Sequence, residues 1–288
     1  MYTYKWDEAT GGILLQEPDE PGMKEEVFPV YADELTVLGL DRYFNYDKDN
    51  SRPYMWTVNV FNDYLYFYRG RQVAVAHGRD CERLPELEIT CGPELTDMPL
   101  QQVDIDAMCE KNAPLIDRIA GDTIETIRKA HEEYRDRIDD FAVAYSAGKD
   151  SSLLLDLVVR ALPPDAFRVV FHDSRMENRS TYELWEEVRQ ELNALGIRTD
   201  VTRSEFSPEE MWRKFGPPAS GLRWCCSVFK TSPSVFASRE RNGNKPVKTM
   251  TLTGVRGAES SARASRDVIQ YGKKHAGEWG CGPILDWS

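Results

Sequence analysis

A short run of small, hydroxyl and charged residues interrupts the apolar segment from Phe141 to Asp156 and has the composition of an anion-binding turn. An apolar strand pattern precedes the run, and a leucine-rich helical pattern follows it. Amides at the start of a helix lack backbone partners and carry a partial positive charge, so they attract phosphate. Small residues let the backbone approach the anion, while hydroxyl and ammonium groups add donors. The predicted phosphate-binding residues are Ser146, Ala147, Gly148, Lys149, Ser151 and Ser152.

The spacing of this run differs from that of a Walker loop, which has four residues between its first glycine and its Gly-Lys-Ser/Thr. A GTPase-like protein or a motor ATPase is therefore not predicted. On this run alone, a strand–helix turn with a serine or aspartate as the helix cap remains the alternative to a phosphate site.

Strand and helix patterns alternate along the C-terminal half of the chain. This alternation predicts an α/β fold with a parallel twisted sheet, helices on both of its faces, and ligands outside the carboxyl ends of its strands. The predicted strands are Phe141–Tyr145, Phe167–His172, Arg198–Thr202 and Val247–Thr253, and the predicted helices are Asp150–Leu162 and Ser180–Leu195.

The N-terminal part has a different pattern. Residues 54–78 alternate apolar with polar or aromatic side chains and predict a β-meander with turns at 61–63 and 69–71. Its aromatic residues are expected to form a strand face that packs on a small core, and stacking on nucleic-acid bases is the less favoured alternative. Helical spacing then predicts a linking helix, broken at Gly121. The predicted organisation is a small β-rich domain at 1–110, a linking helix at 111–140 and the α/β domain at 141–288.

Composition limits the function classes. The 288-residue chain has a net charge of −12, so contact with nucleic acid requires a local basic patch or a basic partner. The first thirty residues lack a signal-peptide pattern and no apolar run is long enough to span a membrane, so a cytoplasmic protein is expected. Six cysteines without a secretory signal favour reduced thiols, metal ligands or redox chemistry over a disulfide framework. Cys81, Cys91 and Cys109 are expected to be buried structural thiols.

The run Ser146-Ala-Gly-Lys-Asp-Ser151 resembles the Ser-Gly-Gly-Lys-Asp-Ser loop of the ATP pyrophosphatases, the PP-loop or adenine-nucleotide α-hydrolase-like superfamily. Ala147 stands where that family usually has glycine, a change that costs little if its φ is negative. Four later segments resemble the phosphoadenosine-phosphosulfate (PAPS) reductase-like branch of the superfamily. They are Phe171–Glu177, Gly221–Lys230, Gly254–Arg263 and Pro283–Trp287.

This resemblance implies roles for further residues. Asp173 follows a strand at the same sheet edge and is a candidate to hold Mg²⁺ or the ribose. Arginine and lysine side chains in the later segments can bind phosphate or a sulfate-like group, with a surface ion-pair network as the alternative. The implied nucleotide-binding residues are Asp173, Gly254 and Arg256, and the implied substrate-binding residues are Arg223, Lys230, Glu259 and Arg263.

Adjacent cysteines raise the question of an iron–sulfur cluster. Relatives with a Cys-Cys pair and a later Cys-x-x-Cys hold a cubane, which needs a full set of ligands. Here Cys225 and Cys226 are followed by Cys281 alone. Either the chain is a fragment truncated at its C-terminus, or the cluster is absent, held by three cysteines or completed by a partner.

The resemblance implies an ATP pyrophosphatase that uses ATP and Mg²⁺, releases pyrophosphate and adenylates an acceptor oxygen for sulfur transfer. The implied catalytic residues are Lys149, Asp150 and Ser151. That these three are intact favours this activity over assimilatory reductases, whose loop is usually degraded. The expected pathway is DNA phosphorothioation, with a cysteine desulfurase and other DNA-modification proteins as partners. A phosphoadenosine or adenosine phosphosulfate reductase and a non-catalytic nucleotide sensor are the alternatives.

Overall fold

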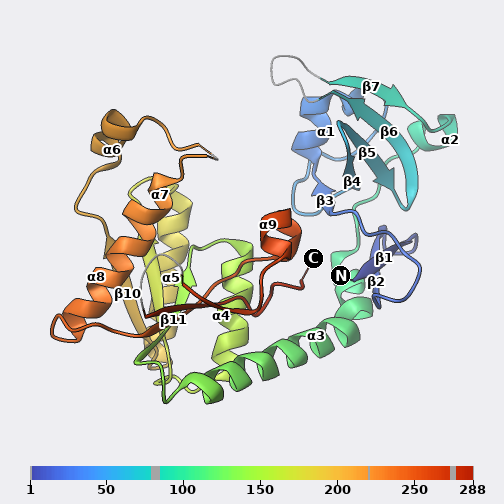
Figure 1. The fold of residues 1–288 in the computed structure, drawn as a ribbon. Helices are drawn as coiled ribbons and strands as arrows, with labels where there is room; N and C mark the ends of the chain where they lie inside the picture. The colour runs from blue at the N-terminus through green and yellow to red at the C-terminus, as the bar shows by residue number, and fades with distance from the viewer. Residues whose placement is uncertain (1, 79–84, 220, 273–276, 288) are drawn as a thin grey trace. The chain divides into compact units, whose positions relative to one another are not determined.

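A computed structural model describes residues 2–78, 85–219, 221–272 and 277–287. The chain divides into two units, Met1–Arg118 and Ile119–Trp287. The long helix α3 (Ile105–Tyr134) contains the boundary between them (Figure 1). Each unit has its own cluster of buried apolar residues.

The first unit is built from antiparallel strands. β1 (Thr3–Asp7) pairs with β2 (Gly12–Gln16), and a five-stranded sheet runs in the order β3-β4-β5-β6-β7. The predicted meander is confirmed. Its residues Tyr54, Tyr66 and Tyr68 lie in the core, whereas Phe61 in the first turn is 93% exposed. The remaining elements are β3 (Val27–Val30), α1 (Ala32–Leu38), a 3₁₀ turn (Leu40–Arg42), β4 (Met55–Val60), β5 (Asp63–Tyr68), β6 (Arg71–His77), β7 (Glu86–Ile89) and α2 (Pro93–Thr96).

Two N-terminal cysteines differ from expectation. Cys109 is exposed and Cys91 is only half-buried, so the expectation of buried structural thiols is wrong for Cys109. Cys109 lies near the start of α3, followed by Glu110 and Lys111, which are also exposed. Cys81 lies outside the described residues.

The second unit contains the predicted α/β sheet. Its six strands run in the order β10-β9-β8-β11-β13-β12, all parallel except β12. The strands are β8 (Asp140–Tyr145), β9 (Arg168–Asp173), β10 (Arg198–Arg203), β11 (Thr249–Leu252), β12 (Ile269–Tyr271) and β13 (Glu278–Cys281). The helical elements are α4 (Lys149–Ala161), α5 (Arg179–Ala194), α6 (Pro208–Phe215), α7 (Trp224–Cys226), the π-helical η2 (Ser227–Thr231), α8 (Ser232–Arg241), the 3₁₀ turn η3 (Gly257–Glu259) and α9 (Ser261–Ala264).

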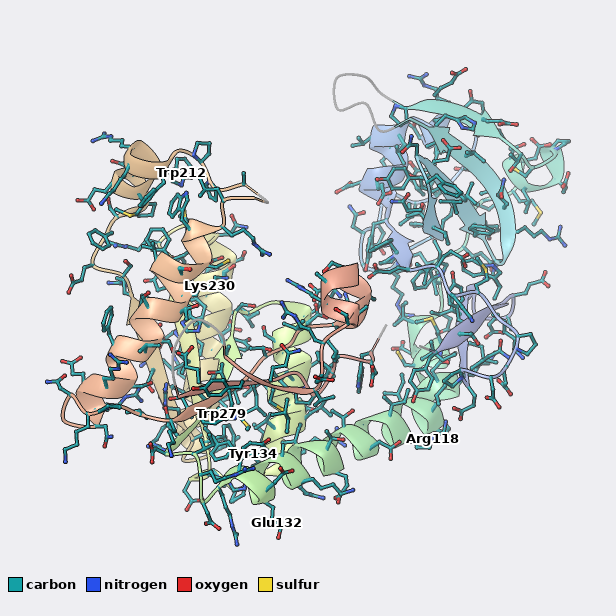
Figure 2. The ribbon with its side chains drawn as sticks, viewed as in Figure 1. Arg118, Glu132, Tyr134, Trp212, Lys230 and Trp279 are labelled. Carbon is teal, nitrogen blue, oxygen red and sulfur yellow. The ribbon has the colours of Figure 1, made fainter. Side chains whose placement is uncertain are left out.

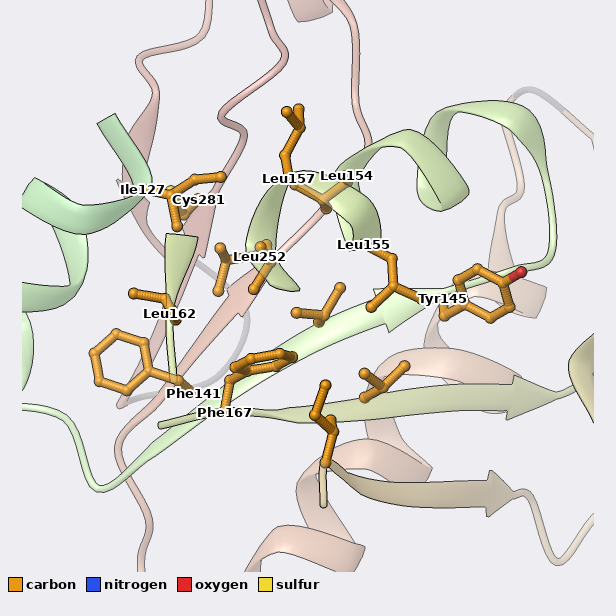
Figure 3. Packing of buried hydrophobic residues seen from close by; sticks show 14 of the residues in the cluster. Ile127, Phe141, Tyr145, Leu154, Leu155, Leu157, Leu162, Phe167, Leu252 and Cys281 are labelled. Carbon is orange, nitrogen blue, oxygen red and sulfur yellow. The ribbon is translucent and has the colours of Figure 1, made fainter. Parts of the chain in front are cut away.

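The two faces of this sheet differ in polarity. Phe171 of β9 stacks on Trp185 of α5 at a centroid distance of 4.9 Å. Both belong to the apolar cluster that includes Leu154, Leu155 and Leu157 of α4 (Figure 3). Arg168 of the same strand donates to Ser238 Oγ of α8 at 2.9 Å. Because residues three apart in a strand point to opposite faces, α5 and α8 cover opposite faces of the sheet. The prediction of helices on both faces of the sheet is thus confirmed. The face covered by α5 is apolar, and the face covered by α8 is polar.

The linking helix is continuous where a break was expected. α3 runs through Gly121, which is exposed and has no heavy atom within 4 Å of an added Cβ. Helical hydrogen bonding continues through one glycine at a cost of about 1 kcal/mol relative to alanine. The prediction of a break is therefore wrong.

Gly121→Ala is expected to raise the free energy of unfolding by about 0.5–1 kcal/mol, since alanine loses less backbone entropy in a helix. Chemical denaturation would measure this. The matched control is Gly196→Ala. A Cβ at Gly196 also meets no atom within 4 Å, but Gly196 has a φ of +77°, which strains an alanine, so this variant should destabilise the protein. A loss of stability in both variants would mean that the helix is interrupted at Gly121.

Candidate functional site

The predicted phosphate loop lies where the sheet topology reverses. The chain moves from β8 to β9 and β10 on one side, then returns to place β11 on the other side of β8. The carboxyl ends of β8 and β11 are therefore neighbours, and ligands of open α/β sheets bind outside such a switch point. The loop Ser146–Gly148 follows β8, and Gly254 follows β11.

Gly254 lies directly against the first turn of α4. A Cβ placed on Gly254 would lie 2.7 Å from the carbonyl oxygen of Asp150 and 3.0 Å from the amide nitrogen of Ser151. Only glycine permits this approach without displacing the backbone. The segment after β11 can therefore meet the first turn of α4 because residue 254 is a glycine.

Ala147 occupies the left-handed region, with a φ of 56°. The expectation that an alanine is inexpensive here assumed a negative φ, and that assumption is wrong. A left-handed conformation costs a non-glycine residue roughly 1–2 kcal/mol. The loop therefore holds backbone strain at the position where related loops have glycine.

Ser151 organises this loop from within. Its Oγ is buried, donates to the Gly148 carbonyl oxygen at 2.9 Å, and accepts from the amides of Ser146 and Gly148, both at 3.2 Å. Ser146 Oγ lies 3.1 Å from the same atom. Ser151 therefore acts on the loop itself, and the amides of the first α4 turn are the donors that a phosphate can use without displacing it.

Asp150 joins two cations beside the loop. Lys149 Nζ lies 3.2 Å from Asp150 Oδ1, and Arg256 Nε lies 3.0 Å from the same oxygen. The Lys149 side chain is 75% exposed, whereas that of Arg256 is 11% exposed. Lys149 can therefore turn toward a ligand, while Arg256 holds Asp150 in place. The Oγ of Ser152, in the first turn of α4, lies 3.3 Å from the Tyr145 hydroxyl of β8.

Glu259 organises the segment after β11. It accepts from the Arg256 amide at 2.9 Å and forms an ion pair with Arg263. Burial opposes ionisation of Glu259, but these two partners outweigh it and hold the pKa of this carboxyl below its usual range. Glu259 and Arg263, both predicted to bind substrate, are thus linked to each other and to Arg256.

Asp173 is buried at the carboxyl end of β9, and both of its oxygens already accept hydrogen bonds. Oδ1 accepts from the Arg175 amide and the Tyr182 hydroxyl, each at 2.8 Å, and Oδ2 accepts from Arg203 Nε at 2.9 Å. Burial acts against ionisation, yet these donors, led by Arg203, keep the pKa of Asp173 below its usual range. A Mg²⁺ ion bound by Asp173 would therefore have to replace one of these hydrogen bonds.

The three predicted cluster cysteines do not converge. Cys281 lies in the apolar core at the end of β13, and burial raises the pKa of its thiol to about 12. Cys225 and Cys226 are on α7, beside a separate small cluster centred on Trp224. Within the described ranges, no three His, Cys, Asp or Glu side chains are placed to hold a metal. Cys225, Cys226 and Cys281 therefore do not form a cluster site by themselves, which excludes the alternative of a cluster held by these three cysteines alone.

Arg223 and Lys230 lie on a different segment from the loop. Arg223 precedes α7, and Lys230 (Figure 2) lies in η2. The η2 segment packs against β9 and β10. The sequence did not single out His172, whose Nδ1 lies 2.8 Å from Thr202 Oγ1. Burial, with help from the charges of Lys230 and Arg168, lowers the pKa of His172 to about 4. His172 is thus a neutral polar group beneath η2.

The partners of Asp173 were also missed. Arg203 is the last residue of β10 and lies directly opposite Asp173 in the parallel register. Its position at a strand end was the sequence feature that could have indicated this pairing. Arg175 has a φ of 59°, and its guanidinium donates to the carbonyl oxygens of Ser204 and Phe206. No sequence pattern indicates that link between the loops after β9 and β10.

Ala147→Gly is expected to raise the free energy of unfolding by about 0.5–1 kcal/mol, because relief of left-handed strain exceeds the added unfolded-state entropy. The control Ala144→Gly, in β8, should lower it. An equal decrease in the free energy of unfolding in both variants would show that Ala147 is not strained.

Gly254→Ala is expected to displace the first turn of α4 and weaken ATP binding at least about tenfold, since overpacking a fixed backbone contact costs about 1–3 kcal/mol. Equilibrium dialysis would measure binding and thermal unfolding would measure stability. Gly280→Ala is the matched control, because its added Cβ meets no atom within 4 Å. Unchanged ATP binding in Gly254→Ala would remove this contact from the site.

Comparison with known proteins places the α/β unit in a family. The chain is 30% identical over 183 residues to an uncharacterised protein of Methanocaldococcus jannaschii, covering 64% of this chain and 36% of that protein. A second uncharacterised protein of that organism is 24% identical over 233 residues, covering 78% of this chain and 51% of that one. The chain thus spans about half or less of these curated relatives. It is 26% identical over 165 residues to an adenosine 5′-phosphosulfate reductase of Bacillus mycoides, covering 55% of this chain and 62% of the reductase.

Solved structures with some similarity include a PAPS reductase from Candida auris in a phosphate complex. It has 19% identity and a TM-score of 0.38, and the match covers 56% of this chain and 73% of that one. The phosphoadenosine phosphosulfate reductase domain family matches residues 140–288, more than half of the 288 residues. The chain belongs to the phosphoadenosine phosphosulfate reductase domain family.

Proposed function

We propose that this protein cleaves ATP between its α and β phosphates and adenylates an acceptor oxygen in preparation for sulfur transfer. The observation that carries the proposal is the exposed Lys149 at the start of α4, beside a loop at the switch point of the sheet. Asp150, the neighbour of Lys149, is held by Arg256 from the adjacent strand end.

The geometry supports charge stabilisation as the source of catalysis. The acceptor oxygen attacks the α-phosphorus, the bond to the α–β bridging oxygen breaks, and pyrophosphate leaves. The amides of the first α4 turn and the ammonium of Lys149 stabilise the charge of the departing group. Ser151 keeps the loop in shape for this purpose, and Gly254 leaves room for it.

Magnesium enters this proposal as part of the substrate, because ATP is bound as its magnesium complex. Both Asp173 oxygens are engaged by protein donors, and the described residues form no cluster suited to a resident metal. The chain's own residues do not fit an iron–sulfur cluster, so no step is assigned to one.

The proposed acceptor is the DNA backbone, with the sulfur delivered by a cysteine desulfurase. Adenylation makes a poor oxygen leaving group into AMP, which a sulfur nucleophile can displace. The chain's net charge of −12 opposes direct duplex binding, so a basic partner would bring the DNA.

The test is release of AMP and pyrophosphate from ATP with Mg²⁺. Lys149→Ala is expected to lower kcat about 100-fold, the typical effect of removing one group that stabilises transition-state charge. The matched control is Lys129→Ala, which removes an exposed lysine of α3 paired with Glu125 and should leave the rate unchanged.

Product identity decides the reaction class. ADP and phosphate as products would contradict α–β cleavage. Tight ATP binding without products would instead identify a nucleotide sensor. Ser151→Ala is a less direct probe, because it also removes the hydrogen bonds that hold the loop.

A reductase is the second candidate, and its support is the family match together with the similarity to an adenosine 5′-phosphosulfate reductase. In that case the loop and Arg256 would hold a phosphosulfate nucleotide. Sulfite release from such a nucleotide with a dithiol reductant, combined with no AMP or pyrophosphate from ATP, would favour this candidate.

A further inference from the structure

The six-stranded sheet has an open edge at β10. This strand ends the order of the sheet and pairs only with β9 within the described part of the chain. An edge strand presents backbone N–H and C=O groups that can pair with another extended segment. Val201, in the middle of β10, is 50% exposed.

A groove of about 680 Å³ lies along this edge. One wall is β10 with the segment that follows it, and the other wall is η2 and α8. Phe236 of α8 is 66% exposed and Phe206 is 50% exposed, so the groove offers large apolar side chains to an occupant. Its size falls in the range of about 300–1,000 Å³ typical of ligand sites.

The polar docking of α8 explains why the groove is open. α8 meets the sheet through the contact of Ser238 with Arg168, and Arg241 pairs with Asp200 at 2.5 Å. These contacts fix the helix by charge and hydrogen bonding. Phe236 is left on the outer side.

The groove has an acidic lining. Glu205 and Glu240 are exposed, and neither makes an ion pair with another described residue. Arg203, the basic residue of the lining, is already paired with Asp173. A complementary occupant therefore carries positive charge as well as apolar side chains.

We propose that this groove binds an extended, basic segment of a partner protein, which adds to β10 as a further strand. Apolar side chains of the segment contact Phe236 and Phe206, and its lysine or arginine residues pair with Glu205 and Glu240. Side chains alternate along a strand, so a segment with alternating apolar and basic residues satisfies both requirements. A second copy of this chain is less complementary, because it would bring a net charge of −12 to an acidic groove. The proposal stands independently of the proposed activity.

The test uses three fluorescent heptapeptide probes. The first alternates lysine with valine, leucine or phenylalanine, the second replaces lysine with glutamate, and the third is the lysine peptide with alternate backbone nitrogens methylated. Fluorescence anisotropy with the full chain is expected to show binding of the lysine peptide. The glutamate and N-methylated peptides should bind at least tenfold more weakly.

Variants locate the binding site. Phe236→Asp and the double variant Glu205→Lys, Glu240→Lys are expected to weaken binding of the lysine peptide at least tenfold. Val37→Asp is the matched control, since Val37 is 70% exposed on α1 and should have no effect. Thermal unfolding of each variant checks that it remains folded, which the exposure of these side chains favours.

Three outcomes would overturn the proposal. They are no binding by any lysine peptide, equal binding by the N-methylated peptide, and equal binding by the Phe236→Asp variant. Sedimentation showing a dimer that Val201→Lys dissociates would assign the groove to a second copy instead. ATP turnover is measured in parallel with the same variants and is expected to be unchanged, so failure of this proposal is distinct from failure of the proposed function.

Discussion

The close approach of Gly254 to the first turn of α4 is the constraint on which the candidate site depends. The reversal of strand order makes the ends of β8 and β11 neighbours, but neighbouring strands alone leave the loops free to diverge. The absent side chain at Gly254 lets the two backbones meet. Arg256, two residues later, is then close enough to pair with Asp150. The electrostatics of the loop are therefore a consequence of a steric feature of the neighbouring segment.

A second constraint acts on the opposite face of the sheet, where Arg168 is almost completely buried. Burying a charge costs several kcal/mol unless partners compensate for it. Here Asp140, Asp200 and Ser238 supply acceptors from two neighbouring strands and from α8. The network orients α8 on the sheet through directional contacts, in contrast to the apolar packing of α5. Apolar side chains of α8 are consequently available on its outer side.

Most of the sheet and the position of the loop could be predicted from the sequence, because both follow from local patterns. Alternation of apolar residues indicates buried strands, and small residues between a strand and a helix mark the turn. The helix α4 begins at Lys149, one residue before its predicted start. What the patterns could not show is long-range pairing. The link between Asp173 and Arg203 requires the strand register, and the separation of Cys281 from Cys225 requires the complete fold.

Ser151 shows why residue type alone does not determine the partner of a side chain. A hydroxyl at a helix start can serve a ligand or the backbone, and composition does not distinguish the two uses. In this loop the hydroxyl bonds the amides on either side of Ala147, which keeps that residue in its left-handed conformation. A phosphate that took over these amides would have to break those bonds and release the strain. A phosphate that used the first-turn amides of α4 would leave the loop intact. The second route requires less rearrangement, and it places the anion next to Lys149.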